Sequence, residues 1–559
     1  MSSIPTPSAL NAETETYPIL TIAQIERVRP WARLRMVQAG EVLYQPGDLG
    51  VPLFILLSTV VQIVQPDADG ERAVTVLSPG MFTGEAGMIG GQRAVVLARA
   101  MQSGEVLEVH PQELRALVAR DVQLSEVLLR AFILRRLMLI TRQLGNVLIV
   151  GSRHSANTVR LREFLGRNGH PYTYVDLDVD GGSQALLDRF SIGAADIPIV
   201  ICNGRAVLHN PSPRELAEFL GLNDNVDRSL LRDLVIVGAG PAGLAAAVYA
   251  ASEGLAPLII ESHAPGGQAG ASSRIENYPG FPMGISGQEL ASNAATQAQK
   301  FGAKVVVAQA IVQLNCDRRP YELVMEDGSV LFARAIVIAT GACYKKPAIA
   351  DLARFEGRGI HYGATHLEAQ LCLDEEVVVV GGGNSAGQAA VFLSQTARKV
   401  YMLVRSGDLA ETMSRYLIQR INGNPSIELL CDTEIIGLSG EDSLAEVNWM
   451  NKKTQQISGM ATRHVFIMTG ASPNTEWVRG RIALDPNGFI LTGRDLPLFA
   501  PREVTPPWPL KRAPQLFESS LPGVFAVGDV RAGSVKRVAS AVGEGAIAVS
   551  LVHRTLAEL

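Results

Sequence analysis

The chain has 559 residues, 47% of them hydrophobic, and a formal net charge of −5. Its length suits three or four compact domains, and its charge offers no excess of cations to a nucleic acid. No apolar stretch approaches the roughly 20 residues that cross a bilayer, and the opening segment lacks the basic start and apolar run of a signal peptide. We therefore expect a cytoplasmic protein that binds neither nucleic acid nor membrane, with a flexible tail over residues 1–20.

The N-terminal part, from Ile22 to Ser103, is predicted to be β-structure. Short apolar runs such as LFILL and AVTVL alternate with turn sequences such as PGD, DADG and SPG, a pattern typical of an all-β fold. From about Val122 to Leu144 apolar residues recur at helical spacing. We therefore predict a β-roll closed by a helix over residues 21–144.

A small α/β domain is predicted over residues 145–222. Its strands are expected in NVLIVG, YTYVDLD and PIVICNG, and its helices at Ala156–Leu165, Ser183–Phe190 and Pro213–Leu220. The segment LNDNVDRSLL follows as a polar linker. A second, larger α/β region then begins with a strand near Asp233.

The first strand of this larger region runs into the glycine turn VIVGAGPAG, and an Ala-rich helix follows it. The three glycines are Gly238, Gly240 and Gly243. They permit a tight turn and a close backbone approach, so that a pyrophosphate can lie at the positive end of the helix. Glu261, at the end of the next strand, is placed to bind the ribose of an adenosine. The pattern predicts a dinucleotide-binding fold.

A second glycine turn, GGGNSA, follows the apolar run from Val377 to Val380. It supplies Gly381, Gly383 and the small Ala386. The strand after it ends in Arg405 and not in an acidic residue, which favours the 2′-phosphate of NADPH over the free hydroxyl of NADH. Arg415 is either a second phosphate ligand or a solvated helix residue.

The five cysteines are scattered, and no two of them stand at a C-x-x-C spacing; they are Cys202, Cys316, Cys343, Cys372 and Cys431. Such cysteines in a cytosolic chain are usually small buried hydrophobic residues, and we expect this of all five. The sequence therefore predicts no local redox or metal motif.

Two dinucleotide folds, the first interrupted by the second, resemble the thioredoxin reductase family. The likeness covers nearly all of residues 233–559 and includes the motifs GGQ, IENYPGF, ATG, SPNT and GVFAVGDV. It implies an FAD-binding domain over residues 230–343 and 465–559 and an NADPH-binding domain over residues 344–464. The resemblance implies flavin-contacting roles for Gln268, Asn277, Gly528, Asp529 and Arg537.

One stretch departs from that family. Where the family carries C-A-T-C, whose sulfurs take electrons from the flavin, this chain reads Gly363-Ala364-Thr365-His366. His366 is either a proton donor near the flavin or a filler of the vacated position. Three functions remain open: an NADPH oxidoreductase with an unknown acceptor, a thioredoxin-disulfide reductase using another cysteine such as Cys343, and a low-activity flavin sensor or scaffold.

The β-roll resembles cyclic-nucleotide-binding domains through FTGEAG and the following Arg93-Ala94-Val95. The resemblance implies that Glu85 binds the ribose hydroxyl and Arg93 the cyclic phosphate of cAMP or cGMP, with Gly84 and Ala86 lending backbone groups. In related rolls the next helix pairs with its twin, which implies a homodimer. A degenerate roll that only packs or dimerises is the alternative.

The small α/β domain resembles glutaredoxins and thioredoxins. Ile197-Pro198 stands where that fold carries a cis-proline, and Ser155 and Thr158 hold the C-x-x-C positions. Without a thiol, this domain is expected to be a redox-inert spacer or docking surface. The predicted fold class is thus multidomain: a β-roll with its helix, a thioredoxin-like α/β domain, and a Rossmann-like flavoprotein with two dinucleotide-binding domains.

Overall fold

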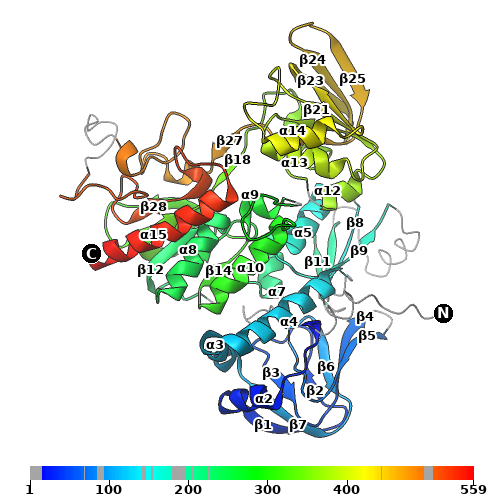
Figure 1. Cartoon of the computed structure of the whole chain (residues 1–559), viewed down its shortest axis with the longest axis vertical. Helices are drawn as coiled ribbons and strands as arrows, with labels where there is room; N and C mark the ends of the chain where they lie inside the picture. The colour runs from blue at the N-terminus through cyan, green and yellow to red at the C-terminus, as the bar shows by residue number, and fades with distance from the viewer. Residues whose placement is uncertain are drawn as a thin grey trace.

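The computed structural model describes most of the chain. Described are residues 15–67, 70–84, 93–141, 147–152, 155–178, 197–202, 206–223, 226–272, 274–364, 366–441, 443–496 and 508–558. Figure 1 shows the β-roll at one end, the second dinucleotide-binding unit at the other, and the small α/β domain and the first dinucleotide-binding unit between them. No described helix is long and apolar enough to cross a membrane.

The roll consists of two antiparallel sheets around a shared apolar core. One sheet has the order β1 (Arg33–Val37), β7 (Gly104–Val109) and β3 (Leu53–Leu56); the other has β2 (Val42–Tyr44), β6 (Leu97–Ala100), β4 (Val61–Asp67) and β5 (Gly70–Leu77). Two elements correct the sequence prediction. Ile22–Val28 is helix α2, because Thr21 and Gln24 form a capping box, and α3 (Pro111–Arg120) follows the last strand.

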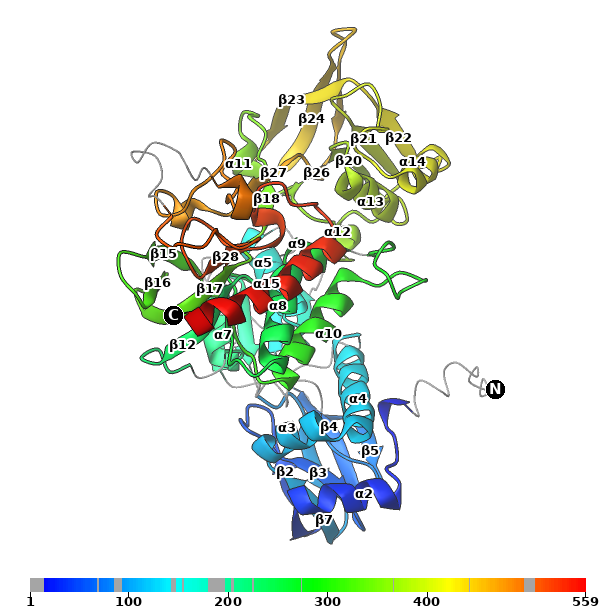
Figure 2. The ribbon, with the colours of Figure 1, turned by 60° about the vertical axis from the view of Figure 1, so that its left-hand side comes forward.

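Helix α4 (Val122–Thr141) leads out of the roll toward the small α/β domain, and both views show it bridging the two (Figures 1 and 2). That domain has a four-stranded sheet of order β11 (Ala206–His209), β10 (Ile199–Cys202), β8 (Val147–Gly151) and β9 (Thr173–Asp176). Only β8 and β9 are parallel. The flanking helices are α5 (Ala156–Arg167) and α7 (Pro213–Leu220).

The predicted elements of this domain agree with the structure, except that β11 was not foreseen. The Ile197–Pro198 peptide bond is cis, as expected. Helix α7 has the predicted bounds because Ser212 and Glu215 form a capping box and Gly221, at φ +63°, ends it. The helix predicted at Ser183–Phe190 lies outside the described residues.

The first dinucleotide-binding unit has a largely parallel sheet. Its strands, in spatial order, are β14 (Lys304–Val306), β13 (Leu258–Ile260), β12 (Leu231–Val237), β17 (Val330–Ile338), β16 (Tyr321–Met325) and β15 (Ile311–Asn315), with β28 (Val524–Ala526) also paired to β17. Helix α8 (Pro241–Ser252) packs between α10 (Gly287–Lys300) and the C-terminal α15 (Val538–Glu558). The first glycine turn leaves this sheet at the end of β12 and leads into α8.

The second unit has a parallel sheet of order β19 (Ile360–His361), β26 (Val465–Ile467), β20 (Glu376–Val380), β21 (Lys399–Leu403) and β22 (Ile427–Leu430). Helices α13 (Asn384–Leu393) and α14 (Arg415–Asn422) and the antiparallel β23 (Thr433–Gly440), β24 (Leu444–Asn451) and β25 (Ile457–Ala461) complete it. Strand β26 pairs with β20, so this unit extends past the boundary expected at residue 464. A two-stranded ribbon, β18 (Ala342–Tyr344) with β27 (Ala471–Pro473), joins the two units.

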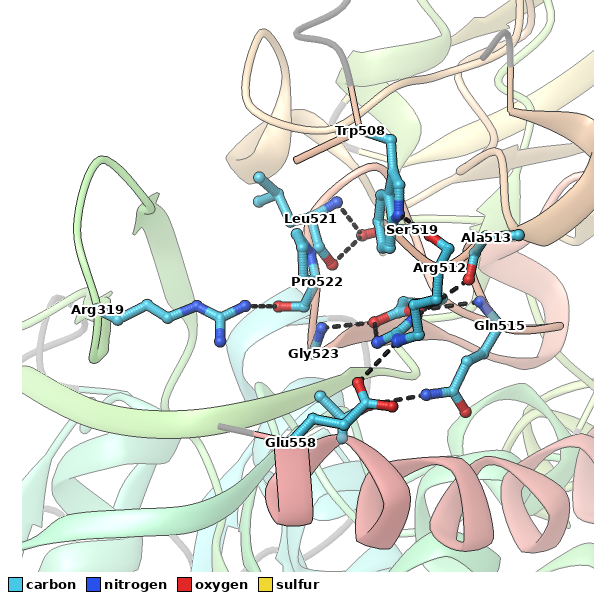
Figure 3. Close-up of polar contacts among 12 residues, drawn as sticks. Arg319, Trp508, Arg512, Ala513, Gln515, Ser519, Leu521, Pro522, Gly523 and Glu558 are labelled. Carbon is cyan, nitrogen blue, oxygen red and sulfur yellow. Dashed lines mark hydrogen bonds and ion pairs between the residues drawn. The ribbon is translucent and has the colours of Figure 1, made fainter. Parts of the chain in front are cut away.

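A buried ion pair holds the segment that leads into β28. The carboxylate of Glu518 is fully buried and pairs with Arg512 at 2.6 Å, while Arg512 also reaches Glu558 of α15 at 2.7 Å. The same carboxylate accepts hydrogen bonds from the backbone N–H of Gln515 and of Gly523. Figure 3 shows Arg512 between this turn and Glu558. Because a buried charge needs partners, this cluster fixes the path of the chain into β28.

Candidate functional site

The first glycine turn joins β12 to α8. Gly238 has φ +105°, and a Cβ there would collide with the carbonyl of Ala339. A Cβ on Gly243 would collide with the carbonyl oxygen of Gly238, so only glycine fits either position. Around Gly240, the N-cap of α8, a Cβ would meet nothing closer than 4.0 Å. The turn therefore leaves open space at the positive end of the helix, which suits a pyrophosphate.

Glu261 lies at the edge of this turn, directly after β13. Its Oε2 accepts a hydrogen bond from the backbone N–H of Ala239 at 2.7 Å, and its Oε1 accepts one from the N–H of His263 at 2.9 Å. The side chain is buried. The carboxylate is thus held against the turn, in the place where the sequence predicts a ribose ligand.

Gln268 and Gly528 approach the same turn from other parts of the chain. Gln268, in the short helix α9 (Gly267–Gly270), donates to the carbonyl of Ala342 in the ribbon. Gly528 has φ +72°, and its position lies against Ala242 of α8. Its N–H donates to Glu544 of α15 at 2.7 Å. Two motifs far apart in the sequence therefore meet at the start of α8. Glu544, which belongs to neither motif, anchors one of them.

Asp529 follows Gly528 and is partly buried, and this burial raises the pKa of its carboxyl group, with Lys536 opposing the shift. Lys536 donates to the backbone carbonyl of Asp529 at 2.7 Å. The side chains of Asn277 and Arg537 are exposed. Their roles at the flavin, like that of Asp529, remain predictions.

The second glycine turn has the same construction. Gly381 has φ +143° and a Cβ there would collide with the carbonyl of Met468, while Gly383 is the N-cap of α13 with open space around it. Ala386 is fully buried, so its small side chain lets the helix pack closely. Arg405 lies two residues beyond β21 and is exposed, as is Arg415 at the start of α14. Among the described residues neither arginine forms a side-chain hydrogen bond or ion pair, so both side chains can approach a ligand phosphate.

A pocket of about 480 Å³ lies between the two units, next to the stretch that replaces C-A-T-C. It is lined by Gln268, Ala271, Ser272, Arg274, Tyr344, Tyr362, Gly363, Ala364, Ser385, Gln388, Ala389 and Met468. A Cβ on Gly363 would lie 3.9 Å from that of Ala271, so this stretch faces the first unit. His366 begins α12 (His366–Leu371), but the position of its side chain lies outside what the structure describes.

All five cysteines are free, and they are not all buried as expected. Cys202 and Cys372 are buried, and burial raises the pKa of each thiol, which makes both poor nucleophiles. Cys316 and Cys431 are partly buried. Cys343 is exposed, because it lies in the two-stranded ribbon, where its Sγ approaches the carbonyl of Ser472 at 3.6 Å. The expectation of a buried residue was therefore wrong for Cys343.

The roll contains a second pocket, with an empty volume of about 520 Å³. It is lined by Tyr17, Tyr44, Val51, Ile63, Val74, Thr75, Leu77, Gly84, Ala94, Val95, Val96, Arg135, Met138 and Leu139. Gly84 lines it, while Glu85 and Ala86 lie outside the described residues, so the nucleotide-binding roles of all three stay predictions. Arg93 lies elsewhere: its Nη1 donates to the carbonyl of Gly47 at 2.8 Å, and its side chain packs against Gly221. The sequence analysis did not identify Arg135, whose only local signal is a cation in an apolar helical stretch.

Comparisons with known proteins match both ends of the chain. Residues 232–545 match the family model described as pyridine nucleotide-disulphide oxidoreductase, and residues 34–121 match the cyclic nucleotide-binding domain. A thioredoxin reductase of Dictyostelium discoideum is 32% identical over 337 residues, which are 59% of this chain and 98% of that protein. A thioredoxin reductase of Streptomyces coelicolor is 31% identical over 330 residues, 59% and 95% of the two chains.

Solved structures agree with this likeness. The thioredoxin reductase of Lactococcus lactis in its FR conformation has a TM-score of 0.52 at 29% identity. The thioredoxin reductase of T. acidophilum has a TM-score of 0.51 at 27% identity. Each comparison covers 59% of this chain and all of the other. The matched part is thus a whole relative, and the roll and small α/β domain are additional to it.

Proposed function

Because the chain belongs to the pyridine nucleotide-disulphide oxidoreductase family and carries a cyclic nucleotide-binding domain, we propose that it is an NADPH-dependent flavoprotein oxidoreductase regulated through that domain. FAD and NADPH are the cofactors of this family. When bound, they supply hydride transfer from the nicotinamide to the flavin and onward electron transfer, and the chain's residues bind and orient them. The two glycine turns, each with open space at a helix N-terminus, fit two dinucleotides.

The observation that carries the proposal is the pocket beside Gly363 and Ala364. In the thioredoxin reductases that this stretch resembles, two sulfurs stand at the positions of Gly363 and His366. In this chain neither position holds a sulfur, and Gly363 and Ala364 line a space of about 480 Å³. This opening lies between the two units and is lined by residues of both, so an external molecule can approach the stretch there. We infer that an external acceptor takes the electrons here, so that no cysteine of the chain is needed. Quinones, oxygen, ferredoxin and a partner protein are the acceptor classes that fit this inference.

The small α/β domain is proposed to have a redox-inert thioredoxin fold. Its sheet order and its cis-proline support this assignment. Ser155 is the N-cap of α5, and the side chain of Thr158 lies beside Gly151, as does Pro198. The two C-x-x-C positions therefore hold hydroxyl groups, of which that of Thr158 lies on the side of the cis-proline, and the domain is a spacer or docking surface without thiol exchange. We further propose a cytoplasmic homodimer.

The deciding experiment is an anaerobic titration of the FAD-loaded full chain with NADPH, followed by an acceptor screen. We expect bleaching of the flavin absorbance near one equivalent of NADPH, and reoxidation by at least one acceptor that carries no disulfide. If the flavin stays oxidised after NADPH is added, the chain is a flavin-binding sensor or scaffold and not an active oxidoreductase. Reoxidation by thioredoxin disulfide alone would overturn the cysteine-independent route.

A second candidate function is disulfide reduction through Cys343. It is favoured by one observation: Cys343 is the exposed cysteine of the chain and lies in the ribbon beside the pocket-lining Tyr344. This function requires a loss of acceptor turnover in Cys343→Ser, whereas the cysteine-independent proposal requires turnover to persist.

A further inference from the structure

We propose that Arg135, and not Arg93, binds the negatively charged phosphate of a cyclic nucleotide in the pocket of the roll. Helix α4 transmits this contact through Arg136 to the flavin-binding loop, by which we mean the GGQ stretch at residues 266–268. The inference rests on the proposed regulation and names the residues that carry it. It assigns one ligand-binding side chain and one route of coupling.

The first observation is the position of the Arg135 guanidinium. Arg135 is 5% exposed and lines the pocket of about 520 Å³. Its Nε donates to the carbonyl of Thr16, and its Nη1 donates to the carbonyls of Phe82 and Gly84, at 2.9 to 3.0 Å. Its Nη2 is buried without a hydrogen-bond partner. One donor of a buried cation is thus left over.

The second observation is that this cation has no counter-ion among the described residues, since its hydrogen-bond partners there are all backbone carbonyls. The guanidinium also lies over the rings of Tyr17 and Phe82. Burial lowers the pKa of Arg135 to about 10, so the group is still charged at neutral pH. A buried charge without an ionic partner is unfavourable and favours an incoming anion. The phosphate of a cyclic nucleotide supplies that anion, and the apolar pocket wall suits a purine.

Arg93 occupies a different environment. Its Nη1 is already bonded to the carbonyl of Gly47, and its Nε, which is also buried without a hydrogen-bond partner, faces Gly221 at the end of α7 in the next domain and not the pocket. Arg93 is therefore placed to join the roll to the small α/β domain. Its charge does not line the pocket that Arg135 lines.

The coupling follows from the residue next to Arg135. The Nε of Arg136 donates to the carbonyl of Gly169, just beyond α5, at 2.6 Å. At the same end of α5, Arg167 donates to the carbonyl of Gly267 at 2.7 Å, and its own carbonyl accepts from Gln288 at 2.8 Å. Gly267 begins the GGQ helix α9 and lies against Gly240 of the first glycine turn. A rotation of α4 that brings Arg135 to a ligand therefore acts on the flavin-binding loop through two hydrogen bonds.

The binding test is calorimetry of cAMP, cGMP and adenosine on the FAD-loaded full chain and on Arg135→Gln, Arg135→Lys and Arg93→Gln. We expect Arg135→Gln to weaken cyclic nucleotide binding about 10- to 100-fold, as for one hydrogen bond to a charged group, and Arg135→Lys to weaken it less. Adenosine lacks the phosphate, so Arg135→Gln should narrow the preference for cAMP over adenosine. Arg93→Gln should change affinity by less than about threefold.

The outcomes are distinct. Loss of binding in Arg93→Gln that equals or exceeds the loss in Arg135→Gln overturns the inference but leaves the proposed regulation standing. An unchanged affinity for cyclic nucleotides in Arg135→Gln also overturns the inference and leaves the proposed regulation standing. If neither cyclic nucleotide gives a heat of binding with the unmodified chain, both the proposed regulation and this inference are refuted. Thermal midpoints of all variants show whether each has folded.

The coupling test uses Arg136→Gln, with Arg130→Gln as its control on the same helix, where Arg130 is 58% exposed. Each is assayed for cAMP binding and for the effect of cAMP on the rate of flavin reduction by NADPH. In the unmodified chain, cAMP should change the rate of flavin reduction by about 5- to 150-fold, the range of typical couplings. We expect both variants to bind cAMP, but only Arg136→Gln to lose this change in rate. A full response in Arg136→Gln would refute the route through Gly169.

Discussion

Glu544 of α15 accepts a hydrogen bond from the backbone N–H of Gly528 at 2.7 Å and pairs through its other oxygen with Arg531 at 2.6 Å. The ion pair is largely buried, with side chains 15% and 12% exposed for Arg531 and Glu544. One carboxylate thus fixes both ends of the short turn that carries Asp529.

Glu544→Gln should weaken FAD binding, because the neutral amide leaves Arg531 without its ionic partner and holds Gly528 less firmly. We expect the dissociation constant of FAD to rise about 10- to 100-fold. Reconstitution of the apoprotein, followed by flavin fluorescence, measures it. Glu253→Gln is the control, since Glu253 pairs with His553 at the surface with 44% of its side chain exposed. Equal affinities in the two variants would show that the turn does not need Glu544.

Gly545→Ala and Gly543→Ala, on the same helix, should have opposite effects. A Cβ on Gly545 would collide with the carbonyl of Ala242, so α15 would be pushed away from the glycine turn, whereas a Cβ on Gly543 meets nothing within 4 Å. We expect Gly545→Ala to lose about 1–3 kcal/mol of stability and to release FAD. Gly543→Ala should gain up to about 1 kcal/mol from helix propensity. Thermal melting with flavin release tests the pair.

Arg405→Ala should narrow the preference for NADPH over NADH. The guanidinium is exposed beyond β21 and is placed to meet the 2′-phosphate, which NADH lacks. Rates of flavin reduction at limiting nucleotide give the ratio for the two cofactors. Arg398→Ala, an exposed arginine at the other end of the same strand, should leave the ratio unchanged. Equal rates with both nucleotides in the unmodified chain would contradict this role.

A variant with every cysteine changed to Ser or Ala should keep NADPH-dependent flavin reduction, and thioredoxin turnover should be very weak before and after the change. All five thiols are free, and burial raises the pKa of Cys202 and Cys372. Stopped-flow absorbance and a thioredoxin assay measure the two properties. Robust thioredoxin turnover that disappears in the variant would show that a thiol carries the electrons.

Acid should destabilise the small α/β domain through His170. This side chain is 5% exposed, and burial, reinforced by the nearby Arg136 cation, lowers its pKa to about 3. In the unfolded chain the pKa is near 6.5, so the unfolded state binds the extra proton, and the free energy of unfolding falls as the pH drops from about 6.5 toward 3. The slope for one such group is at most about 1.4 kcal/mol per pH unit.

Thermal midpoints between pH 7 and pH 5 measure this effect. The midpoint of the unmodified chain should fall more steeply than that of His170→Gln, because carboxylates contribute equally to both. Parallel curves would mean that His170 takes up its proton in the folded state.

The glycine turns and helix α7 were predictable because their determinants are local. A glycine at positive φ, a capping box and a terminal Gly221 act within a few residues of one another. Strand β1 lies within the region predicted to be β-structure, but it was not identified as a separate apolar run, because four of its five residues are not buried. Sequence could not place Arg135 either, because its partners Phe82 and Gly84 are more than fifty residues away.

The two strands of the ribbon bring the beginning and the end of the second unit together. Tyr344 lies opposite Ala471 in β18 and β27, so the chain enters and leaves the second unit at neighbouring points. Paired residues of an antiparallel ladder can be joined by a two-residue turn. Residues 345–470 therefore form a cassette, which can be excised or exchanged for that of a relative by cutting at one place in space, with the sheet that holds the first glycine turn left intact.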